Sequence, residues 1–242
     1  MKRQKTLALA ALASFAVVGC TRAQDDPAFG AKVRAYLLAH PEVIAEAAQK
    51  LQDQRDAASA AKAKLALQHE RQALERDPRD FVANPGGKIT VTEFFDYRCP
   101  HCINAAPSVV KIIHDNPDVR FVFKEMPIFG AVSEHAARTA IAVKQAGGDY
   151  LGLYQTLMST RGLDDAAIDK IARGAGVDPA KTNQSQFRTA ADAQLTDVRK
   201  LANELDIDGT PTFIIGDTTV PGEDIDAVRA AIAKARQGAK AS

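Results

Sequence analysis

The hydrophobic pattern of the chain changes near residue 78. After Pro41, as far as Arg76, the sequence contains neither Gly nor Pro and is dominated by strong helix formers. Apolar residues recur at intervals of seven from just before Pro41 onward: Leu37, Ile44, Leu51, Ala58 and Leu65. Such a repeat indicates a seam that faces another helix. The pattern predicts a long N-terminal helical arm over residues 20–77 that forms a homo-oligomer through residues 28–76, and a solvated linker helix is the alternative.

From residue 78 to residue 242 the pattern alternates between strands and helices. Runs rich in β-branched and aromatic residues predict strands at 89–95, 119–124, 212–215 and 218–220. Helical spacing predicts helices at 105–113, 132–146, 150–159, 164–175, 184–205 and 223–236. The first two strands and the helix between them form a right-handed βαβ unit. The expected fold class is α/β, a small sheet with a helical insertion at about 132–195.

Composition and charge narrow the class of protein. Apolar residues make up 46% of the chain and charged residues 25%, which is ordinary for a globular protein. The net charge is +1 and no basic block lies outside the N-terminus, so we expect no nucleic-acid partner. Only three cysteines are present, which excludes a small scaffold held by several disulfides.

The N-terminus has the features of an export signal. Basic residues precede an apolar or small-residue run over residues 6–18, which is too short to span a bilayer easily. We expect a signal peptide over residues 1–19, with 1–23 as the alternative, and an uncleaved apolar helix as a third reading. Val17-Val18-Gly19-Cys20 resembles a bacterial lipoprotein signal, in which Cys20 would be lipidated and form a lipid anchor in the membrane.

The chemistry of the chain is expected at Cys99-Pro100-His101-Cys102. If a helix begins near Pro100, Cys99 occupies the N-cap, where free N–H groups and the helix dipole stabilise a thiolate. Pro100 fixes the turn, and His101 can add positive charge or a hydrogen bond. Cys102 lies one turn deeper and fits the resolving thiol of a redox-active Cys99-Cys102 disulfide.

Two other readings of this cysteine pair need no exchange chemistry. A structural zinc site needs four ligands, and beyond the pair the chain offers only the distant Cys20 and scattered histidines, so we expect no metal. A purely structural disulfide between positions so close in sequence closes almost no loop and would stabilise the fold little. We expect no cofactor.

Two segments resemble those of the DsbA family of thiol:disulfide oxidoreductases in the thioredoxin superfamily. They are Phe94-Phe95-Asp96-Tyr97-Arg98-Cys99-Pro100-His101-Cys102 and Gly209-Thr210-Pro211-Thr212. The resemblance covers about residues 79–237 and implies a thioredoxin-like fold with an inserted helical domain. It also implies that Pro211 is a cis-proline beside the active-site disulfide and that Thr210 and Pro211 bind extended substrate backbone.

Glu93 and Lys124 are candidates for tuning this site. Glu93 alternates in phase with Val91 and Phe95, which places a carboxylate on an apolar face of the sheet. The family often carries a buried acid at this position, and Lys124, at the end of the next strand, is the expected counter-charge. If neither residue modulates the thiols, both are peripheral charges.

The resemblance implies an enzyme that forms or shuffles disulfides in the periplasm. Its partners would be thiols of unfolded or misfolded exported proteins and a membrane redox partner that recycles the active site. Relatives with an N-terminal oligomerisation arm, the ScsC-like and Com1-like groups, include isomerases, so oxidase and isomerase both remain open. The alternative of a different class is a non-enzymatic, lipid-anchored envelope adaptor or metal-binding chaperone.

Overall fold

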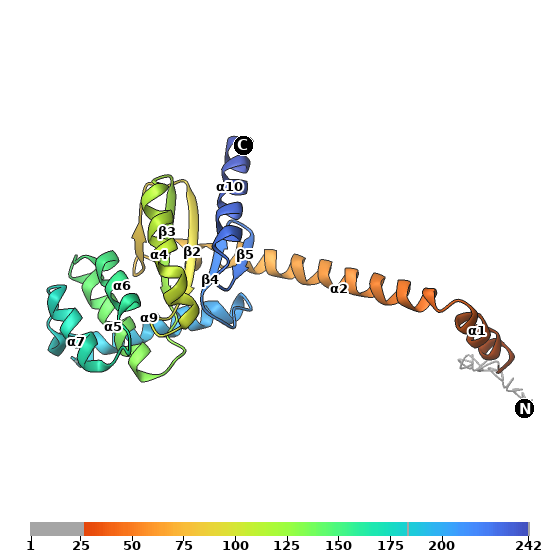
Figure 1. The fold of residues 1–242 in the computed structure, drawn as a ribbon, viewed down its shortest axis with the longest axis horizontal. Coiled ribbons are helices and arrows are strands. Elements are labelled where there is room, and N and C mark those ends of the chain that lie inside the picture. Colours follow the sequence, from red (N-terminus) through yellow and green to blue (C-terminus); the bar gives the residue numbers. More distant parts are fainter. Residues whose placement is uncertain (1–26, 183, 242) are drawn as a thin grey trace, which may run out of the picture. The chain divides into compact units, whose positions relative to one another are not determined.

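A computed structural model describes residues 27–182 and 184–241 (Figure 1). The described chain forms two units, one that ends at Asp56 and one that begins at Ala57. None of the described helices is long and apolar enough to cross a membrane. The expected signal peptide, its alternative cleavage site and the expected lipidation site Cys20 lie outside the described residues.

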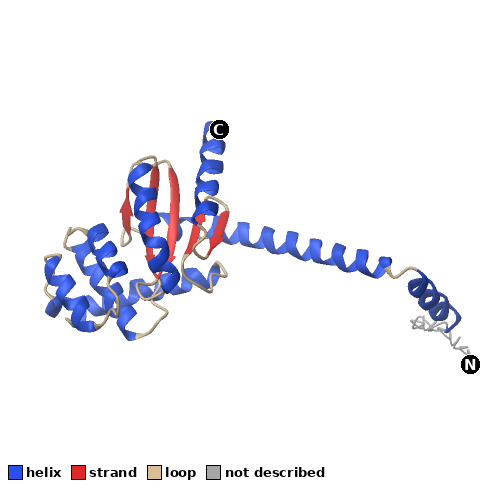
Figure 2. Ribbon diagram, in the orientation of Figure 1, coloured by secondary structure: helices blue, strands red, loops and turns tan. Residues whose placement is uncertain are grey.

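The second unit is built on a five-stranded sheet with the order β1-β3-β2-β4-β5. Its strands are red in Figure 2. The strands are β1 (Phe81–Ala83), β2 (Ile89–Phe95), β3 (Val119–Glu125), β4 (Thr212–Ile215) and β5 (Thr218–Pro221). β2 and β3 run parallel, whereas the other neighbouring pairs are antiparallel. The sequence does not predict β1, because this strand has only three residues and no alternating pattern.

Helices surround this sheet in the order that the sequence predicts. α4 (Pro100–Asp115) connects β2 to β3 and completes the expected βαβ unit. The helical insertion between β3 and β4 consists of α5 (Ala131–Gln145), α6 (Tyr150–Ser159), α7 (Asp165–Gly174), α8 (Pro179–Thr182) and α9 (Ser185–Glu204). α10 (Ile225–Ala241) follows β5. The predicted α/β fold with a helical insertion is therefore confirmed.

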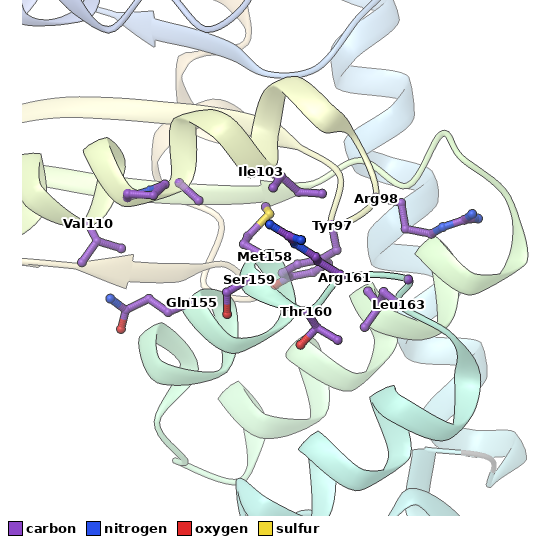
Figure 3. A pocket seen from close by; sticks show the side chains of 13 residues that line it. Tyr97, Arg98, Ile103, Val110, Gln155, Met158, Ser159, Thr160, Arg161 and Leu163 are labelled. Carbon is purple, nitrogen blue, oxygen red and sulfur yellow. The ribbon is translucent and has the colours of Figure 1, made fainter.

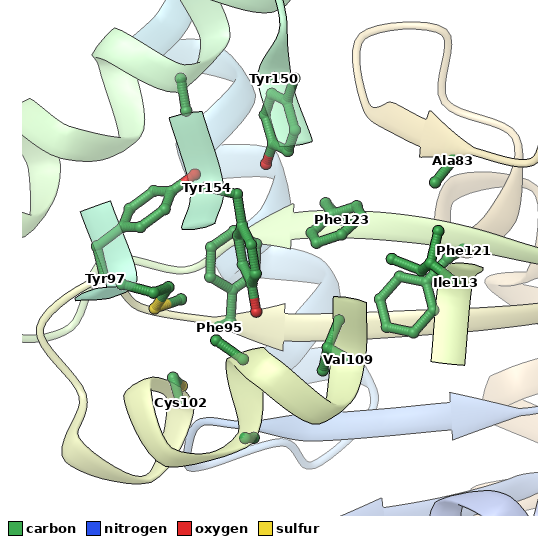
Figure 4. Packing of buried hydrophobic residues seen from close by; sticks show 14 of the residues in the cluster. Ala83, Phe95, Tyr97, Cys102, Val109, Ile113, Phe121, Phe123, Tyr150 and Tyr154 are labelled. Carbon is green, nitrogen blue, oxygen red and sulfur yellow. The ribbon is translucent and has the colours of Figure 1, made fainter. Parts of the chain in front are cut away.

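Aromatic side chains join the insertion to the sheet (Figure 4). The ring of Tyr154, from α6, meets Phe95 at 5.3 Å and Phe123 at 5.1 Å between centroids, both in edge-to-face geometry. Tyr150, one helical turn earlier, lies 5.5 Å from Phe123. Such contacts add to the hydrophobic gain from burying these large rings. The insertion is thus held on the sheet directly behind the cysteine motif, because Cys102 belongs to the same core.

The first unit contains α1 (Pro27–Ala39) and the beginning of α2 (Glu42–His69). The two helices are separated at His40-Pro41, where proline suits the first turn of a new helix. The large apolar side chains of the first unit are 39–66% exposed: Phe29, Val33, Tyr36, Leu38, Ile44 and Leu51. Two seam positions of the seven-residue repeat, Ile44 and Leu51, are therefore open to a further helix.

The end of α2 and the short α3 (Arg71–Glu75) belong to the second unit. Leu67 and Leu74 are 3% and 0% exposed, and they join Phe94 and Val198 in one buried cluster. The compact second unit therefore includes residues 57–77, which the sequence pattern assigns to the helical arm. The predicted continuous helix is interrupted here. α2 ends at His69, and α3 follows as a separate short helix.

Candidate active site

The N-terminus of α4 places Cys99 at the N-cap, with extended backbone angles (φ −69°, ψ 121°) and Pro100 at the first helical position. Proline suits this position because the N–H that it lacks would have no partner within the helix. The described thiols of Cys99 and Cys102 are free, so this is the dithiol form. The helix begins where the sequence analysis expects, and its unpaired N–H groups favour an anion at the Cys99 sulfur.

The loop that leads into Cys99 is held by Asp96, which is 1% exposed. One of its carboxylate oxygens accepts hydrogen bonds from the Arg98 amide at 2.6 Å and the Ser133 hydroxyl at 2.9 Å. The other accepts from the amides of Ile128 and Phe129 at 2.7 and 3.0 Å. Asp96 thereby ties the motif to the start of the helical insertion. The sequence pattern does not single out Asp96, although its place before a turn is a signal for this anchoring role.

The segment before β4 lies against the reactive sulfur. The Cys99 thiol donates a hydrogen bond to the Thr210 carbonyl oxygen at 3.1 Å, and the Thr210-Pro211 peptide bond is cis. The Gly222 amide donates to the Pro211 carbonyl at 2.8 Å, which fixes this segment to the end of β5. Two stretches about 110 residues apart in sequence thus meet at one sulfur atom, as the family resemblance implies.

Both cysteines of the motif are buried. Cys102 is completely buried, whereas Cys99 retains 2% of its surface. Burial raises the pKa of Cys102 strongly, and the nearby Glu93 carboxylate raises it further when it is ionised. A thiolate at Cys102 is therefore costly, which suits a resolving cysteine that is protonated when the disulfide opens.

Glu93 lies in the middle of β2 and has no exposed surface. Burial raises its pKa to about 8, and the Tyr154 hydroxyl opposes this rise only in part. Neither carboxylate oxygen of Glu93 has a regular hydrogen bond in the structure. Glu93 is thus buried on the sheet face that its alternation with Val91 and Phe95 predicts.

The predicted pairing of Lys124 with Glu93 is wrong. In the parallel register Lys124 is opposite Phe94, so its side chain lies on the other face of the sheet from that of Glu93. The Lys124 ammonium pairs instead with Asp80 and donates to the Ala73 carbonyl at 2.6 Å. Burial raises the pKa of Asp80 to about 6 although Lys124 opposes that rise. Lys124 therefore neutralises a buried acid near α3 and not one near the thiols.

Two further acids were not singled out from the sequence. Glu125, the last residue of β3, is buried and accepts a hydrogen bond from the Tyr150 hydroxyl at 2.5 Å, and burial raises its pKa to about 7. Glu223 pairs with the exposed His101 ring at 3.2 Å. The imidazole that is expected to assist Cys99 is thus shared with a carboxylate in the segment between β5 and α10.

Metal ligation has no support in the geometry of the described part of the chain. Within residues 27–182 and 184–241, no three His, Cys, Asp or Glu side chains converge to form a site for a metal ion. The site that the structure assembles is a dithiol at a helix N-terminus, faced by a cis-proline segment and backed by a buried acid.

Two solved structures are similar to this chain over most of its length. A linker-deletion mutant of Proteus mirabilis ScsC is 27% identical, with a TM-score of 0.67, and the match covers 91% of this chain and 99% of that protein. Salmonella enterica Typhimurium BcfH is 31% identical, with a TM-score of 0.69, over 86% of this chain and 94% of that protein.

Among curated proteins, the thiol:disulfide interchange protein DsbA of Bordetella pertussis is 33% identical over 136 residues, which are 54% of this chain and 64% of that protein. The Na⁺/H⁺ antiporter NhaA 1 of Salinispora arenicola is 27% identical over 170 residues, or 68% of this chain. The chain spans only 26% to 65% of the length of the curated relatives that it matches.

Two family descriptions match the chain in separate segments. Residues 27–58 match the copper resistance protein ScsC N-terminal domain, and residues 90–233 match the DSBA-like thioredoxin domain. The second segment contains both cysteines, Glu93 and Pro211, and it makes up more than half of the chain. The chain therefore belongs to the DSBA-like thioredoxin domain family.

Proposed function

We propose that this chain is an extracytoplasmic thiol:disulfide oxidoreductase whose redox couple is Cys99 and Cys102. The observation that carries the proposal is the Cys99 sulfur at the N-cap of α4, 3.1 Å from the carbonyl oxygen that precedes the cis-proline Pro211. A helix N-terminus favours a thiolate, and a thiolate is the reactive form in disulfide exchange.

In the oxidised enzyme, a substrate thiolate attacks the Cys99 sulfur. The Cys99-Cys102 bond breaks as the mixed disulfide forms, and Cys102 leaves with the electron pair. A second substrate thiolate then attacks the substrate sulfur of the mixed disulfide and releases Cys99 as a thiolate. The substrate loses two electrons and gains one disulfide, and the enzyme is left as a dithiol. Shuffling begins instead with attack by the Cys99 thiolate on a substrate disulfide.

Residues around the couple have separate roles in this scheme. Thr210 and Pro211 present backbone to an extended substrate segment beside Cys99. Glu93, which burial keeps protonated near neutral pH, supplies a proton close to the leaving Cys102 thiolate. Pro100 holds the turn, and His101 contributes through its pair with Glu223.

The direct test of this function is insulin reduction in the presence of dithiothreitol. The wild-type protein accelerates the precipitation of insulin, whereas Cys99→Ser and Cys102→Ser each abolish the acceleration. Activity retained in both variants would contradict the enzyme and favour the alternative, an adaptor or metal-binding chaperone. Circular dichroism of all three proteins shows whether the variants are folded.

The proposed substrates are thiols of unfolded or misfolded exported proteins in the periplasm, and a membrane redox partner recycles the couple. The basic and apolar N-terminal segment supports export, with lipidation of Cys20 as the proposed anchor. One similar structure, 29% identical, is described as a periplasmic thioredoxin-like protein from Salmonella enterica serovar Typhimurium. Mass spectrometry of the protein from membranes would detect diacylglycerol on Cys20, and an unmodified N-terminus at residue 24 would exclude the anchor.

We also propose that residues 28–76 form an oligomer that favours shuffling of disulfides. The exposed apolar side chains of α1 and α2 support this, since a surface of this kind is typical of an association site. Several active sites on one assembly would meet the same client at a high effective concentration.

The oligomer is tested with the full mature protein and with a shortened protein that begins at residue 57. Because Leu67 and Leu74 lie in the core of the second unit, the shortening stops before them. Light scattering should give an oligomer for the first protein and a monomer for the second. Refolding of scrambled ribonuclease should slow after shortening, while insulin reduction should be retained. A monomeric mature protein would contradict the proposal.

A further inference from the structure

A pocket of about 600 Å³ opens beside the active-site helix (Figure 3). One wall comes from α4, with Ile103, Ala106 and Val110, and the other comes from the end of α6 and the segment that follows it, including Met158 and Leu163. Thr210 and Pro211 do not line it. The pocket is therefore separate from the cis-proline segment, although its lining residue Arg98 directly precedes Cys99.

The walls of this pocket are mainly apolar, and its charged side chains are all positive. Arg98 and Arg161 are its charged lining residues, and neither Asp nor Glu lines it. Arg98 uses one guanidinium nitrogen to donate to the Phe129 carbonyl at 2.9 Å. The exposed Arg161 guanidinium has no hydrogen-bond or ion-pair partner among residues 27–182 and 184–241. Two cations thus stand beside an apolar hollow without a carboxylate to neutralise them.

We infer that this pocket binds a segment of the substrate protein next to the reacting cysteine, with an apolar side chain in the hollow and a carboxylate against Arg98 and Arg161. The inference rests on the proposed function, because only a substrate that reaches Cys99 is brought to the neighbouring residue Arg98. Pockets lined mainly by apolar groups with a few placed charges are typical of ligand sites. Arginine suits the carboxylate because its planar fork matches the two oxygens.

The occupant is an acidic and apolar stretch of polypeptide because of charge complementarity. A basic flanking segment would place like charges together, whereas a purely polar one would leave the apolar walls wet. The enzyme is thus expected to prefer, among exported proteins, cysteines that have acidic and apolar neighbours.

The test uses the oxidised, full mature protein and short synthetic peptides with one cysteine each. Their central sequences are Glu-Leu-Cys-Leu-Glu, Lys-Leu-Cys-Leu-Lys and Glu-Ser-Cys-Ser-Glu. Each reaction is quenched with acid, and mass spectrometry gives the rate at which the mixed disulfide with Cys99 forms. The proteins are wild type, Arg161→Glu, and the matched control Arg173→Glu, which changes an exposed arginine of α7 outside the pocket.

We expect the ratio of the acidic to the basic peptide rate to fall about tenfold in Arg161→Glu, as expected for reversing a surface ion pair. Intrinsic differences between the peptide thiols cancel in this comparison. Arg173→Glu should keep the wild-type ratio, and the wild type should react several-fold faster with the leucine than with the serine peptide. An unchanged ratio in Arg161→Glu, an equal fall in Arg173→Glu, or equal leucine and serine rates would overturn the inference.

Reduction by dithiothreitol separates this inference from the proposed function. If dithiothreitol cannot reduce a Cys99-Cys102 disulfide in the wild-type protein, the proposed function itself is contradicted. If dithiothreitol reduces it and the peptides are not distinguished, only the pocket assignment is overturned.

Discussion

Replacing Glu93 by Gln should change stability in a way that depends on pH. The stability of the variant minus that of wild type should increase as the pH rises. Glu93 is fully buried, its carboxylate oxygens lack regular hydrogen bonds, and burial raises its pKa from 4.5 to about 8. Between these two pH values the folded protein keeps Glu93 protonated while the unfolded chain ionises. Stability is therefore lost as pH rises from about 4.5 to about 8.

The size of this loss follows from the pKa. Each pH unit in which only the unfolded chain ionises costs about 1.4 kcal/mol, so the loss reaches about 4–5 kcal/mol at pH 8 and remains below about 1 kcal/mol at pH 5. Glutamine has the same shape and does not ionise. The stability difference between Glu93→Gln and wild type should therefore move in favour of the variant by about 3–4 kcal/mol from pH 5 to pH 8. The desolvation cost of the amide is the same at both pH values and cancels.

Urea unfolding followed by far-ultraviolet circular dichroism measures this difference, since the chain has no Trp for fluorescence. The protein is kept reduced with a phosphine at every pH, so that the disulfide does not contribute. Glu204→Gln, at an exposed acid, is the matched control and should follow the wild type. If the difference in unfolding free energy between Glu93→Gln and wild type agrees within about 1 kcal/mol at pH 5 and pH 8, the buried neutral acid is refuted.

Two further substitutions test the supports of the site. Asp96→Asn should lower stability by about 2–3 kcal/mol and slow insulin reduction, because an amide nitrogen cannot accept the hydrogen bonds that hold the cysteine loop; unchanged activity would contradict this anchoring role. Leu74→Ala should cost about 2–5 kcal/mol in urea unfolding because it leaves a cavity in the core, whereas Leu65→Ala, at a residue that is 66% exposed, should stay within about 0.5 kcal/mol. Equal effects at the two leucines would contradict the packing of Leu74 in the core of the second unit.

Local pattern was enough to predict elements whose ends carry strong signals. β2 and β4 have the predicted bounds because β-branched and aromatic runs are set off by Gly, Pro and Asp. The motif at Cys99 was predictable for the same reason, because it follows a buried strand and begins a helix with Pro100. The cis bond at Pro211 could be predicted only from the family resemblance. Few X-Pro bonds are cis, and the spacing of residues does not show which ones are.

Features that depend on register or on tertiary contact could not be predicted. The face on which Lys124 lies relative to Glu93 follows from the pairing of β2 with β3, and a single sequence does not contain that register. The pairing of Glu223 with His101 joins positions far apart in the chain. Helical periodicity likewise does not distinguish a leucine that packs within the chain, such as Leu67, from one that faces a partner.

The most direct test of the redox couple is to locate the mixed disulfide in single-cysteine variants. Cys102→Ser and Cys99→Ser are each incubated with a cysteine peptide activated as its mixed disulfide with a thionitrobenzoate group, and peptide mapping identifies the modified residue. Cys102→Ser should trap the peptide on Cys99 rapidly, whereas Cys99→Ser should react slowly, because Cys102 is completely buried and its pKa is raised. Equal or faster trapping on Cys102 in the Cys99→Ser protein would contradict the assignment of Cys99 as the nucleophile.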